Sequence, residues 1–375
     1  MRFVDEYRDP AAAARLLSGI RRLAGAEPLR VMEICGSHTH VIFRTGLDQV
    51  LAPAVEFVHG PGCPVCVTPR LRVDQAIALA RRPGTIIATY GDMLRVPGRG
   101  TSLRREAAKG ARVKIVYSSL DAVRLARAHP DAEVVFFAVG FETTTPANGY
   151  SILEARRLGL GNFSVLANHV LVPPVIRTLL DDPETRVDAF IGPGHVSTIV
   201  GKGDYTFASR EYGRPVVISG FEQNDILQAV YMLLRQRAEG RCEVEVQYTR
   251  AVRAAGNARA RALVERVFTL ADQEWRGLGV IPQSGLTIRP EFAAYDAAVK
   301  FRALLPQVPS REPAACICAR IVKGTAKPFE CPSFGTACTP ERPLGACMVS
   351  SEGTCAAYHR YRGVPERGPR REVGA

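Results

Sequence analysis

Cysteines near the C-terminus of this chain could hold an iron–sulfur cluster. Six of the ten cysteines fall within the last sixty residues. Four of these six have a spacing suited to one [4Fe–4S] cluster, which is bound by four cysteine thiolates: Cys316, Cys331, Cys338 and Cys355. The remaining two, Cys318 and Cys347, are left over in the same region.

A second sulfur site is predicted near the N-terminus. Cys35 opens the sequence CGSHTH at 35–40, after a strand-like segment and before a helix-like segment at 40–51. Amide groups at a helix N-terminus lower the pKa of a thiol, so we expect a nucleophilic or metal-binding thiolate at Cys35. The histidines at 38 and 40 favour this interpretation over that of a small buried cysteine in a tight turn.

Cys63 and Cys66 form a Cys-x-x-Cys unit in GPGCPVC at 60–66, which suits a reversible disulfide or two ligands on one metal. Adjacent parallel strands end at the same edge of a sheet, so we expect this unit to meet Cys35 there. Three thiolates at one site would select a soft or borderline metal such as iron or zinc. A structural zinc site on the same three cysteines is the alternative.

Polar residues also follow other strand-like segments. Glu142, Asp92 and His195 could act with His38 as acids, bases or hydrogen-bond partners. Turn formation alone would also account for these loops. The role of His59, beside the cysteine pair, stays open. The chain has no G-x-x-x-x-G-K-[ST] phosphate-binding loop.

Length and composition indicate a globular protein of two or three domains. The chain has 375 residues, of which 46% are hydrophobic and 23% charged. No apolar run reaches the ~18 residues that span a bilayer, and the N-terminal segment lacks the apolar stretch of a secretory signal. We therefore expect a cytoplasmic protein without a membrane partner, in which cysteines serve as metal ligands, redox groups or buried residues rather than structural disulfides.

The net charge of +12 comes from basic residues scattered along the chain. No block of five or six basic residues and no nucleic-acid recognition motif accompanies this charge. We therefore expect no nucleic-acid partner.

Short apolar segments alternate with helix-like segments over residues 1–245. The strand candidates are 29–34, 55–59, 85–90, 113–117, 134–139, 164–168, 188–191 and 215–219. The helix candidates include 71–81, 120–128, 149–157 and 225–237. This alternation is typical of an α/β fold with parallel sheets covered on both faces. We expect two Rossmann-like lobes facing a cleft, residues 1–130 with Cys35 and Cys63/Cys66 and residues 131–245, with a break near 129–133.

The pattern changes in the third expected domain, residues 246–375. A strand at 242–252 and a helix at 258–272 are predicted at its start. After residue 301 the chain is rich in Pro, Gly and Cys, so a metal cluster would supply the stabilisation that a small apolar core cannot. We expect a small cysteine-rich iron–sulfur domain, and a disordered tail after residue 361.

Four motifs in this order resemble the HypD family of [NiFe]-hydrogenase maturation proteins. They are CGSHTH at 35–40, GPGCPVC at 60–66, GFETT at 140–144 and CMVSSEGTC at 347–355. The resemblance extends from about residue 30 to residue 360. It implies two α/β lobes and a cluster domain, and a scaffold role in assembly of the Fe(CN)2CO unit of the hydrogenase active site. The implied partners are a HypC-type chaperone and a HypE-type cyanide donor.

The resemblance also implies residue roles. Cys35 would be the iron-binding thiolate, paired with a cysteine of the HypC-type partner, and Cys63 and Cys66 would be an essential thiol pair beside it. The four cysteines at 316, 331, 338 and 355 would ligate a [4Fe–4S] cluster, as in ferredoxin:thioredoxin reductase. Cys318 and Cys347 would form a second redox pair. The expected activity is assembly with redox chemistry rather than conventional turnover.

Release of cyanide from a thiocyanate-like donor needs two electrons, and a dithiol pair can supply two. We therefore expect a relay from the cluster through Cys318/Cys347 to Cys63/Cys66, which requires the two sulfur sites to be close in space. The main alternative is a cluster-linked disulfide reductase that acts on a partner protein. A binding module with structural zinc sites is the third interpretation. Cys242 is expected to be a buried structural thiol.

Overall fold

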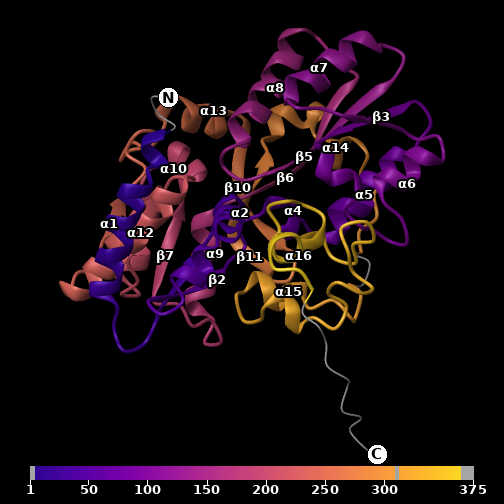
Figure 1. The fold of residues 1–375 in the computed structure, drawn as a ribbon. Coiled ribbons are helices and arrows are strands. Elements are labelled where there is room, and N and C mark those ends of the chain that lie inside the picture. Colours follow the sequence, from indigo (N-terminus) through magenta and orange to yellow (C-terminus); the bar gives the residue numbers. More distant parts are fainter. Residues whose placement is uncertain (1–4, 309–311, 365–375) are drawn as a thin grey trace, which may run out of the picture.

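The computed structural model describes residues 5–308 and 312–364 and shows an α/β fold with two sheets (Figure 1). The predicted fold class is thereby confirmed, whereas two lobes facing a cleft stay a prediction. The first sheet has the strand order β2-β1-β7-β8-β9, and all its strands are parallel. Its strands are β1 (Leu29–Glu33), β2 (Val55–His59), β7 (Ala189–Pro193), β8 (Val216–Ser219) and β9 (Val244–Val246).

The second sheet has the order β10-β11-β6-β5-β3-β4. Its strands are β3 (Thr85–Thr89), β4 (Arg112–Ile115), β5 (Glu133–Gly140), β6 (Phe163–Val170), β10 (Phe268–Trp275) and β11 (Gly279–Ile288). Strands β3 to β6 are parallel. The hairpin of β10 and β11 is antiparallel and adds to the edge of β6.

Each sheet combines strands from distant parts of the chain. The first sheet takes strands from 29–59 and from 189–246, and the second takes strands from 85–170 and from 268–288. The expected boundary near residue 130 falls between β4 and β5, which both belong to the second sheet. It therefore does not coincide with the division between the sheets. Chain order alone cannot reveal this exchange, because a crossover can enter either sheet.

Helices cover the faces of both sheets. The α-helices are α1 (Pro10–Leu23), α2 (Gly36–Thr45), α3 (Leu47–Val50), α4 (Pro64–Val67), α5 (Arg70–Ala80), α6 (Leu103–Ala108), α7 (Ser119–Ala128), α8 (Thr145–Arg157), α9 (Val172–Asp181), α10 (Gly194–Val200), α11 (Thr206–Arg210), α12 (Gln223–Ala238), α13 (Ala258–Val267), α14 (Ala297–Lys300), α15 (Cys318–Val322) and α16 (Thr354–Tyr361). Short 3-10 helices are η1 (Asp5–Tyr7), η2 (Gly91–Leu94), η3 (Gly203–Tyr205), η4 (Pro290–Tyr295), η5 (Arg302–Leu304), η6 (Pro328–Glu330) and η7 (Ala346–Met348).

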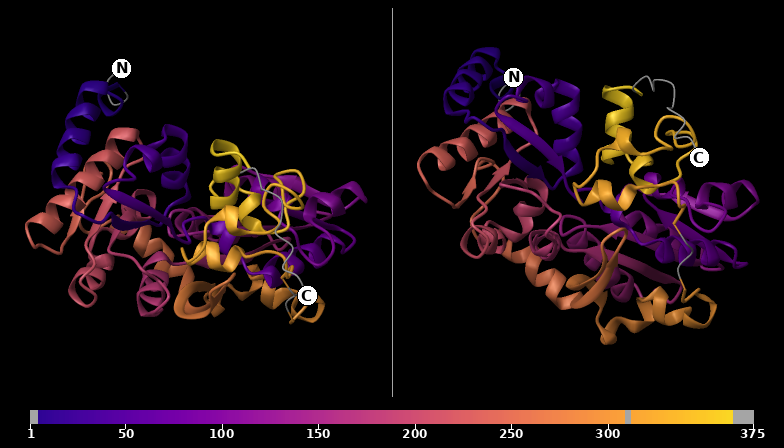
Figure 2. Two further views of the ribbon diagram at one scale, coloured as in Figure 1. Left: turned by 60° about the horizontal axis from the view of Figure 1, so that its bottom comes forward. Right: turned by 90° about the horizontal axis from the view of Figure 1, so that it is seen from below.

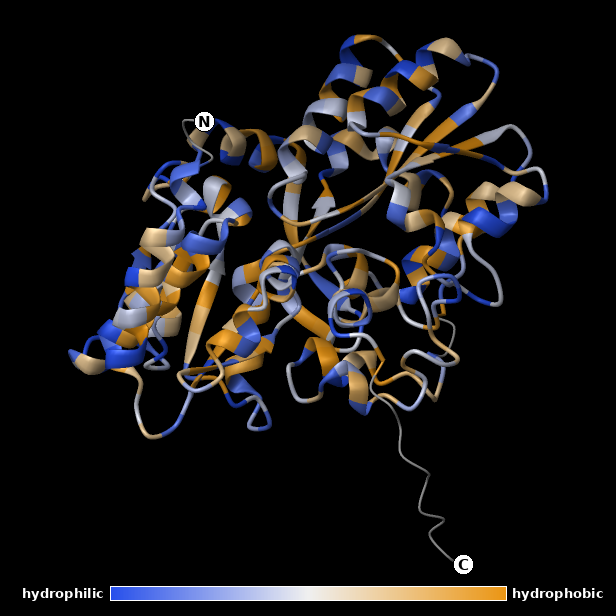
Figure 3. Ribbon diagram, viewed as in Figure 1, coloured by the Kyte–Doolittle hydropathy of each residue, from blue (hydrophilic) through white to orange (hydrophobic). Residues whose placement is uncertain are grey.

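Both faces of the first sheet are buried. Val31 packs with α2 and α12 residues such as Ile42 and Leu233, whereas its neighbour Met32 packs in a separate core with Ile176 of α9. Figure 3 shows the apolar residues concentrated along the strands and the polar ones on outer helix turns and loops. Burial on two faces explains why these strands are short apolar runs rather than alternating ones.

Two predicted elements after residue 240 differ from the structure. The predicted strand at 242–252 forms ladder pairs only over Val244–Val246. The predicted helix at 258–272 ends at Val267, because Phe268 adopts extended backbone and pairs with Ile288 of β11. The hairpin of β10 and β11 and helix α1 were not predicted.

The cysteine-rich segment after residue 312 has short helices in place of a sheet. Its last helix, α16, lies beside α2 in the different views (Figure 2), and Tyr361 there is hydrogen-bonded to His40 at 3.1 Å. Arg362 also forms an ion pair with Asp48. Most of the tail expected to be disordered, residues 365–375, lies outside the described residues. Over the described ranges, no helix has the length and apolar character needed to cross a membrane.

Candidate functional site

Cys35 lies where β1 ends and α2 begins, and it is packed against the loop that carries the cysteine pair. The N–H of Gly36 donates to the carbonyl of Gly62 at 2.9 Å. A Cβ atom on Gly62 would lie 2.3 Å from the backbone nitrogen of Cys35. Position 62 therefore requires glycine, and the two motifs fit together as predicted from their positions after adjacent strands.

The buried carboxylate of Glu33 joins these two loops. It accepts the N–H of Cys35 at 3.0 Å and a hydrogen bond from the Thr39 hydroxyl. It also lies 2.8 Å from Nδ1 of His59, at the end of β2. Glu33 is 0% exposed, so these three partners replace the solvation that burial removes. His59, whose role the sequence left open, thus orients the carboxylate behind Cys35.

The expectation of a lowered pKa at Cys35 is wrong for this structure. Burial raises the pKa of the Cys35 thiol to about 12, and the nearby Glu352 carboxylate adds to the rise. The N–H groups of Ser37 and His38 at the start of α2 lower it, but their effect is smaller. Cys35 is therefore a neutral thiol at neutral pH, and a bound cation would be needed to favour its thiolate.

Glu352, from the C-terminal region, is part of the same site. Its Oε1 accepts the hydroxyl of Ser37 at 2.9 Å. Its backbone packs against Gly36 so closely that a Cβ there would lie 2.5 Å from the Glu352 carbonyl oxygen. Burial raises the pKa of the Glu352 carboxyl. The N-terminal and C-terminal motifs therefore meet at Cys35.

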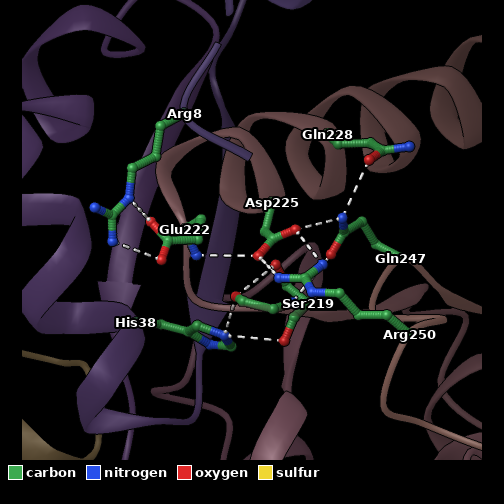
Figure 4. Close-up of polar contacts among 9 residues, drawn as sticks. Arg8, His38, Ser219, Glu222, Asp225, Gln228, Gln247 and Arg250 are labelled. Atoms are coloured by element: carbon green, nitrogen blue, oxygen red, sulfur yellow. Dashed lines mark hydrogen bonds and ion pairs between the residues drawn. The ribbon is translucent and has the colours of Figure 1, made fainter. Parts of the chain in front are cut away.

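His38 holds a fixed tautomer against the end of β8 (Figure 4). Its Nε2 lies 3.2 Å from the carbonyl oxygen of Ser219 and 3.0 Å from that of Gly220, so Nε2 carries the proton. Nδ1 is buried and has no partner within the described residues. Burial lowers the pKa of His38 to about 4. The ring is thus neutral and offers a free acceptor lone pair, the form in which histidine binds metals.

The structure behind His38 is an ordered polar network. Asp225 accepts two hydrogen bonds from Arg250, at 2.8 and 2.5 Å, and one from Gln247 at 2.8 Å (Figure 4). Next to it, Phe221 stacks on His38 with a centroid distance of 4.7 Å and on His195 with 3.8 Å. His195 is therefore placed near His38, as a ring stacked on the far side of Phe221.

Glu142 is a buried acid that stays protonated at neutral pH. Its Oε1 accepts the N–H of Val172 at 2.9 Å, and its Oε2 has no partner within the described residues. Burial raises its pKa to about 8. Tyr205 lies within electrostatic range of both Glu142 and Cys35. Burial is the main cause that holds the pKa of Tyr205 well above its usual range, and the negative charge that Glu142 carries when ionised adds to it.

The two cysteine pairs expected to exchange electrons lie in one buried cluster. Cys66 interacts with the thiols of both Cys63 and Cys347. The sulfur atoms of Cys347 and Cys318 are 2.6 Å apart. All four cysteines are free thiols and belong to the same apolar cluster. Burial together with the Cys347 and Cys63 contacts raises the pKa of the Cys66 thiol. The fold therefore brings the two cysteine pairs together, which the sequence alone could not establish.

Arg276 lies beside this series of thiols. It comes from the turn between β10 and β11, and its N–H donates to the carbonyl of Val67 at 2.9 Å. Its guanidinium is paired with Glu312 at 2.7 Å and lies within electrostatic range of Cys318 and Cys347. The side chain is buried, and Nε and Nη1 have no partner within the described residues. The contact with Cys316 and the Arg276 cation lower the pKa of Cys318, but the contact with Cys347 and burial hold that pKa well above its usual range.

The four remaining C-terminal cysteines belong to the same apolar cluster or pack against it. Cys331, Cys338 and Cys355 are buried and Cys316 is partly buried. Cys338 is within electrostatic range of Cys316 and Cys331, and Cys355 of Cys316 and Cys338. The N–H of Leu344 donates to the sulfur of Cys338 at 3.3 Å.

No three or more His, Cys, Asp or Glu side chains of residues 5–308 and 312–364 are grouped closely enough to hold a metal ion. The metal-ligand roles of Cys35, Cys63 and Cys66 and of the four cluster cysteines therefore stay predictions. Cys242 lies apart from these groups, with its thiol 3.5 Å from the carbonyl oxygen of Ser209.

Comparison with known proteins agrees with the resemblance seen in the motifs. The family model described as "HypD: Hydrogenase formation hypA family" matches residues 11–362. The chain belongs to the HypD family. A protein named Hydrogenase maturation factor HypD from Rhodobacter capsulatus is 52% identical over 373 residues, which cover 97% of this chain and 99% of that protein. Proteins of the same name from Azotobacter vinelandii (52% over 371 residues, 96% and 97% covered) and Escherichia coli strain K12 (45% over 369 residues, 96% and 98% covered) are also similar.

Three residues of this HypD-family chain belong to the site but were missed in the sequence. Glu33 was read as part of an apolar strand, and Glu352 as part of the motif at 347–355 without a role of its own. A charged residue inside a buried strand is the signal that could have identified Glu33, because burial of a carboxylate requires dedicated partners. Arg276 gave no local signal, since its role depends on a hairpin that was not predicted.

Proposed function

We propose that this HypD-family chain is a hydrogenase maturation factor that serves, with a HypC-type chaperone, as the scaffold on which the Fe(CN)2CO unit is assembled. The observation that carries the proposal is the contact of the Cys63/Cys66 unit with the Cys318/Cys347 pair in a single buried cluster. This arrangement supports two-electron thiol chemistry beside Cys35. The similar proteins are named Hydrogenase maturation factor HypD, which supports a role in hydrogenase maturation.

In this proposal Cys35 provides the thiolate that this chain contributes to the iron, which is the cargo of the scaffold. Burial keeps Cys35 protonated in the free chain, so iron binding releases a proton. The unpartnered Nδ1 of His38 could act as a further ligand. The protonated carboxyl of Glu142 could act as a proton donor. A HypC-type chaperone would supply a further thiolate.

Thiol–disulfide exchange would move two electrons toward Cys35. The Cys347 thiolate attacks the Cys66 sulfur of a Cys63–Cys66 disulfide, forms a Cys66–Cys347 mixed disulfide and releases Cys63 as a thiolate. The Cys318 thiolate then attacks the Cys347 sulfur, closes a Cys318–Cys347 disulfide and releases Cys66. Two protons follow the two electrons, and Arg276 stabilises the attacking thiolates.

The reduced pair at Cys63 and Cys66 can then release cyanide from a HypE-type donor. A thiocyanate group and two thiols give one thiol from the donor, one Cys63–Cys66 disulfide, cyanide and a proton, so atoms and electrons balance. The glycine-rich loop of this pair lies directly against the backbone of Cys35. Cyanide would therefore be released near the proposed iron site.

The four cysteines Cys316, Cys331, Cys338 and Cys355 suit a [4Fe–4S] cluster. They form an all-sulfur donor set in an apolar environment, and the Leu344 N–H donated to Cys338 is typical of the hydrogen bonds that tune cluster thiolates. Each of the four cysteines would contribute one thiolate to such a cluster. A bound cluster would supply electrons one at a time.

The exchange route is tested by trapping. The Cys63–Cys66 disulfide is formed in the purified chain, a reductant is added, and differential alkylation with mass spectrometry follows each cysteine. We expect Cys347→Ser and Cys318→Ser to slow reduction of the Cys63–Cys66 disulfide, and Cys318→Ser to accumulate the Cys66–Cys347 mixed disulfide. Cys242→Ser, which alters a cysteine outside the cluster, is the matched control. Equal rates in all four proteins would rule out the route.

The alternative of a disulfide reductase acting on a partner is less well supported. Such an enzyme needs the cysteine pair and a cluster, but it gives no role to Cys35 or to the unpartnered Nδ1 of His38.

A further inference from the structure

The strand at one edge of the second sheet lies largely in solvent. In the described part of the chain β4 pairs only with β3, so its other side has no neighbouring strand. Arg112, Lys114 and Ile115 are exposed and Val113 is partly buried. The residues of β3, by contrast, are all buried, as is usual for strands of a parallel sheet with helices on both faces.

The open side of β4 presents backbone groups that can pair with another strand. The N–H of Val116, just after β4, donates to the carbonyl of Thr89 in β3 at 3.0 Å. Successive residues of a strand direct their backbone groups to opposite sides, so the N–H and C=O groups of Val113 and Ile115 point away from β3. Within the described residues these groups have no hydrogen-bond partner. A row of unpaired groups of this kind is where an extended peptide can add to a sheet.

One face of this edge is apolar and uncovered. Val113 and Ile115 lie on the same face because side chains alternate along a strand, and Tyr117 follows two residues later, just beyond the end of β4. Val113 packs against the core. Ile115 is 51% exposed and Tyr117 is 93% exposed. The core therefore ends at Val113, and an apolar surface continues beyond it.

The opposite face of β4 is basic. Arg112 and Lys114 alternate with the apolar residues and have no hydrogen-bond or ion-pair partner in the part of the chain that the structure describes. Four cations and one carboxylate, Glu106, line the cavity beside the start of β4. Glu106 is already paired with Arg81 and Lys109. The basic face therefore favours acidic side chains on a partner.

These charges decide between a second copy of this chain and a different partner. If two copies joined through β4, Arg112 and Lys114 of one copy would lie beside the same residues of the other, which is unfavourable. Basic residues on edge strands commonly prevent such self-pairing. An acidic strand meets no such repulsion.

We propose that the open edge of β4 docks an extended segment of a partner protein in which apolar and acidic residues alternate. The backbone of this segment would pair with Val113 and Ile115. Its acidic side chains would face Arg112 and Lys114, and its apolar side chains would cover Ile115 and Tyr117. The alternation follows from the pleat of the sheet, which places successive side chains of any added strand on opposite faces.

This edge adjoins a segment that reaches the thiol site. A Cβ atom on Gly91 of η2 would lie 3.9 Å from Cγ2 of Ile115. Arg95, directly after η2, donates to the carbonyl of Val349 at 2.7 Å, within the motif at 347–355. A partner docked on β4 would thus lie beside an element that contacts this motif. The docking itself does not depend on the thiol chemistry at Cys35.

Binding of short synthetic peptides tests the edge. A fluorescently labelled peptide in which valine and glutamate alternate is titrated with the full chain, and fluorescence anisotropy reports binding. We expect saturable binding that weakens with added salt. A peptide of the same composition, with its valines and its glutamates in separate blocks, should bind at least roughly tenfold more weakly, because it cannot place the two kinds of side chain on opposite faces.

Charge reversal tests the basic face. Lys114→Glu should weaken binding of the alternating peptide roughly tenfold or more, because an attractive contact becomes repulsive. Lys202→Glu makes the same change of charge at an exposed position outside β4 and should leave binding unchanged. Equal losses in the two variants would reveal a diffuse attraction to the basic protein and overturn the proposal. So would equal binding of the two peptides, or the absence of saturable binding.

Proline at position 115 separates strand pairing from side-chain contacts. Ile115→Pro removes an N–H that points away from β3, a place where edge strands tolerate proline, whereas Ile115→Thr keeps this N–H. Both variants should keep the far-UV circular dichroism of the parent protein, and Ile115→Pro should bind the alternating peptide roughly tenfold more weakly than Ile115→Thr. Equal binding by these two variants would overturn the pairing through the backbone. A dimer of the parent protein in analytical ultracentrifugation that Ile115→Pro dissociates would overturn the assignment to a different partner.

Discussion

Replacement of Glu142 by glutamine should make the protein more stable at alkaline pH. The Glu142 carboxyl is 6% exposed and accepts one backbone N–H, at 2.9 Å. Burial raises its pKa from 4.5 to about 8. Glutamine keeps the acceptor oxygen and the size of the side chain, but it cannot ionise. The substitution therefore isolates the free energy of holding a protonated carboxyl in the interior.

The expected magnitude follows from the pKa difference. Below pH 4.5 both states are protonated, and the contribution of the neutral carboxyl to stability is complete. As pH rises toward 8 the unfolded chain has lost the proton and the folded chain retains it, so stability falls. The difference between 8 and 4.5 corresponds to a total loss of roughly 5 kcal/mol, of which about 3 kcal/mol is lost by pH 7.

The chain contains a convenient probe for this measurement. Its single tryptophan, Trp275, is buried and stacks on Phe141 with a centroid distance of 6.0 Å, next to Glu142 in sequence. Urea unfolding followed by tryptophan fluorescence should show Glu142→Gln gaining ~4 kcal/mol relative to the parent protein between about pH 5 and pH 9. Glu265→Gln, at an exposed position, should show no such gain. A stability difference between Glu142→Gln and the parent that does not change with pH would refute the assignment of a buried, protonated carboxyl.

Other substitutions test the surroundings of the site. Gly62→Ala should destabilise the protein by ~1–3 kcal/mol, because the added Cβ would overlap the backbone of Cys35. In Gly161→Ala the added Cβ meets no atom within 4 Å, so this control should have little effect. Urea unfolding measures the stability of both variants. Arg250→Gln leaves the buried carboxylate of Asp225 without its cation and should lower the free energy of unfolding by roughly 3 kcal/mol. Arg157→Gln, in an exposed ion pair, should lower it by less than ~1 kcal/mol. Similar losses of stability in the two variants would contradict the role of the buried pair. Arg276→Gln should slow transfer of the disulfide between the two thiol pairs roughly tenfold, measured by alkylation trapping, because a neighbouring cation shifts a thiol pKa by about one unit or more.

The sequence predicted those elements whose signal is local. The strand predicted at 55–59 matches β2, and the helix predicted at 120–128 matches α7 to within one residue. Apolar runs and capping residues determine such segments without help from distant contacts. The end of the predicted helix at 258–272 was wrong because the pairing of Phe268 with Ile288 decides it, and this contact spans the hairpin.

The site was only partly predictable for a similar reason. The cysteine motifs identified the thiols, and their place after adjacent strands put Cys35 beside Cys63. The protonation state of Cys35 could not be predicted, because it depends on burial and on Glu352, which is more than three hundred residues away in the chain. The contact between Cys66 and Cys347 likewise arises from the packing of η7 against α4, which are far apart in the chain.

Infrared spectroscopy tests the scaffold role most directly. The chain is isolated together with a HypC-type chaperone from cells that contain all maturation partners, and Cys35→Ala is isolated in parallel. We expect stretching bands from iron-bound cyanide and carbon monoxide in the parent complex, and their loss in Cys35→Ala although the complex still forms. A parent complex without these bands, or a Cys35→Ala complex in which they persist unchanged, would contradict iron assembly at Cys35.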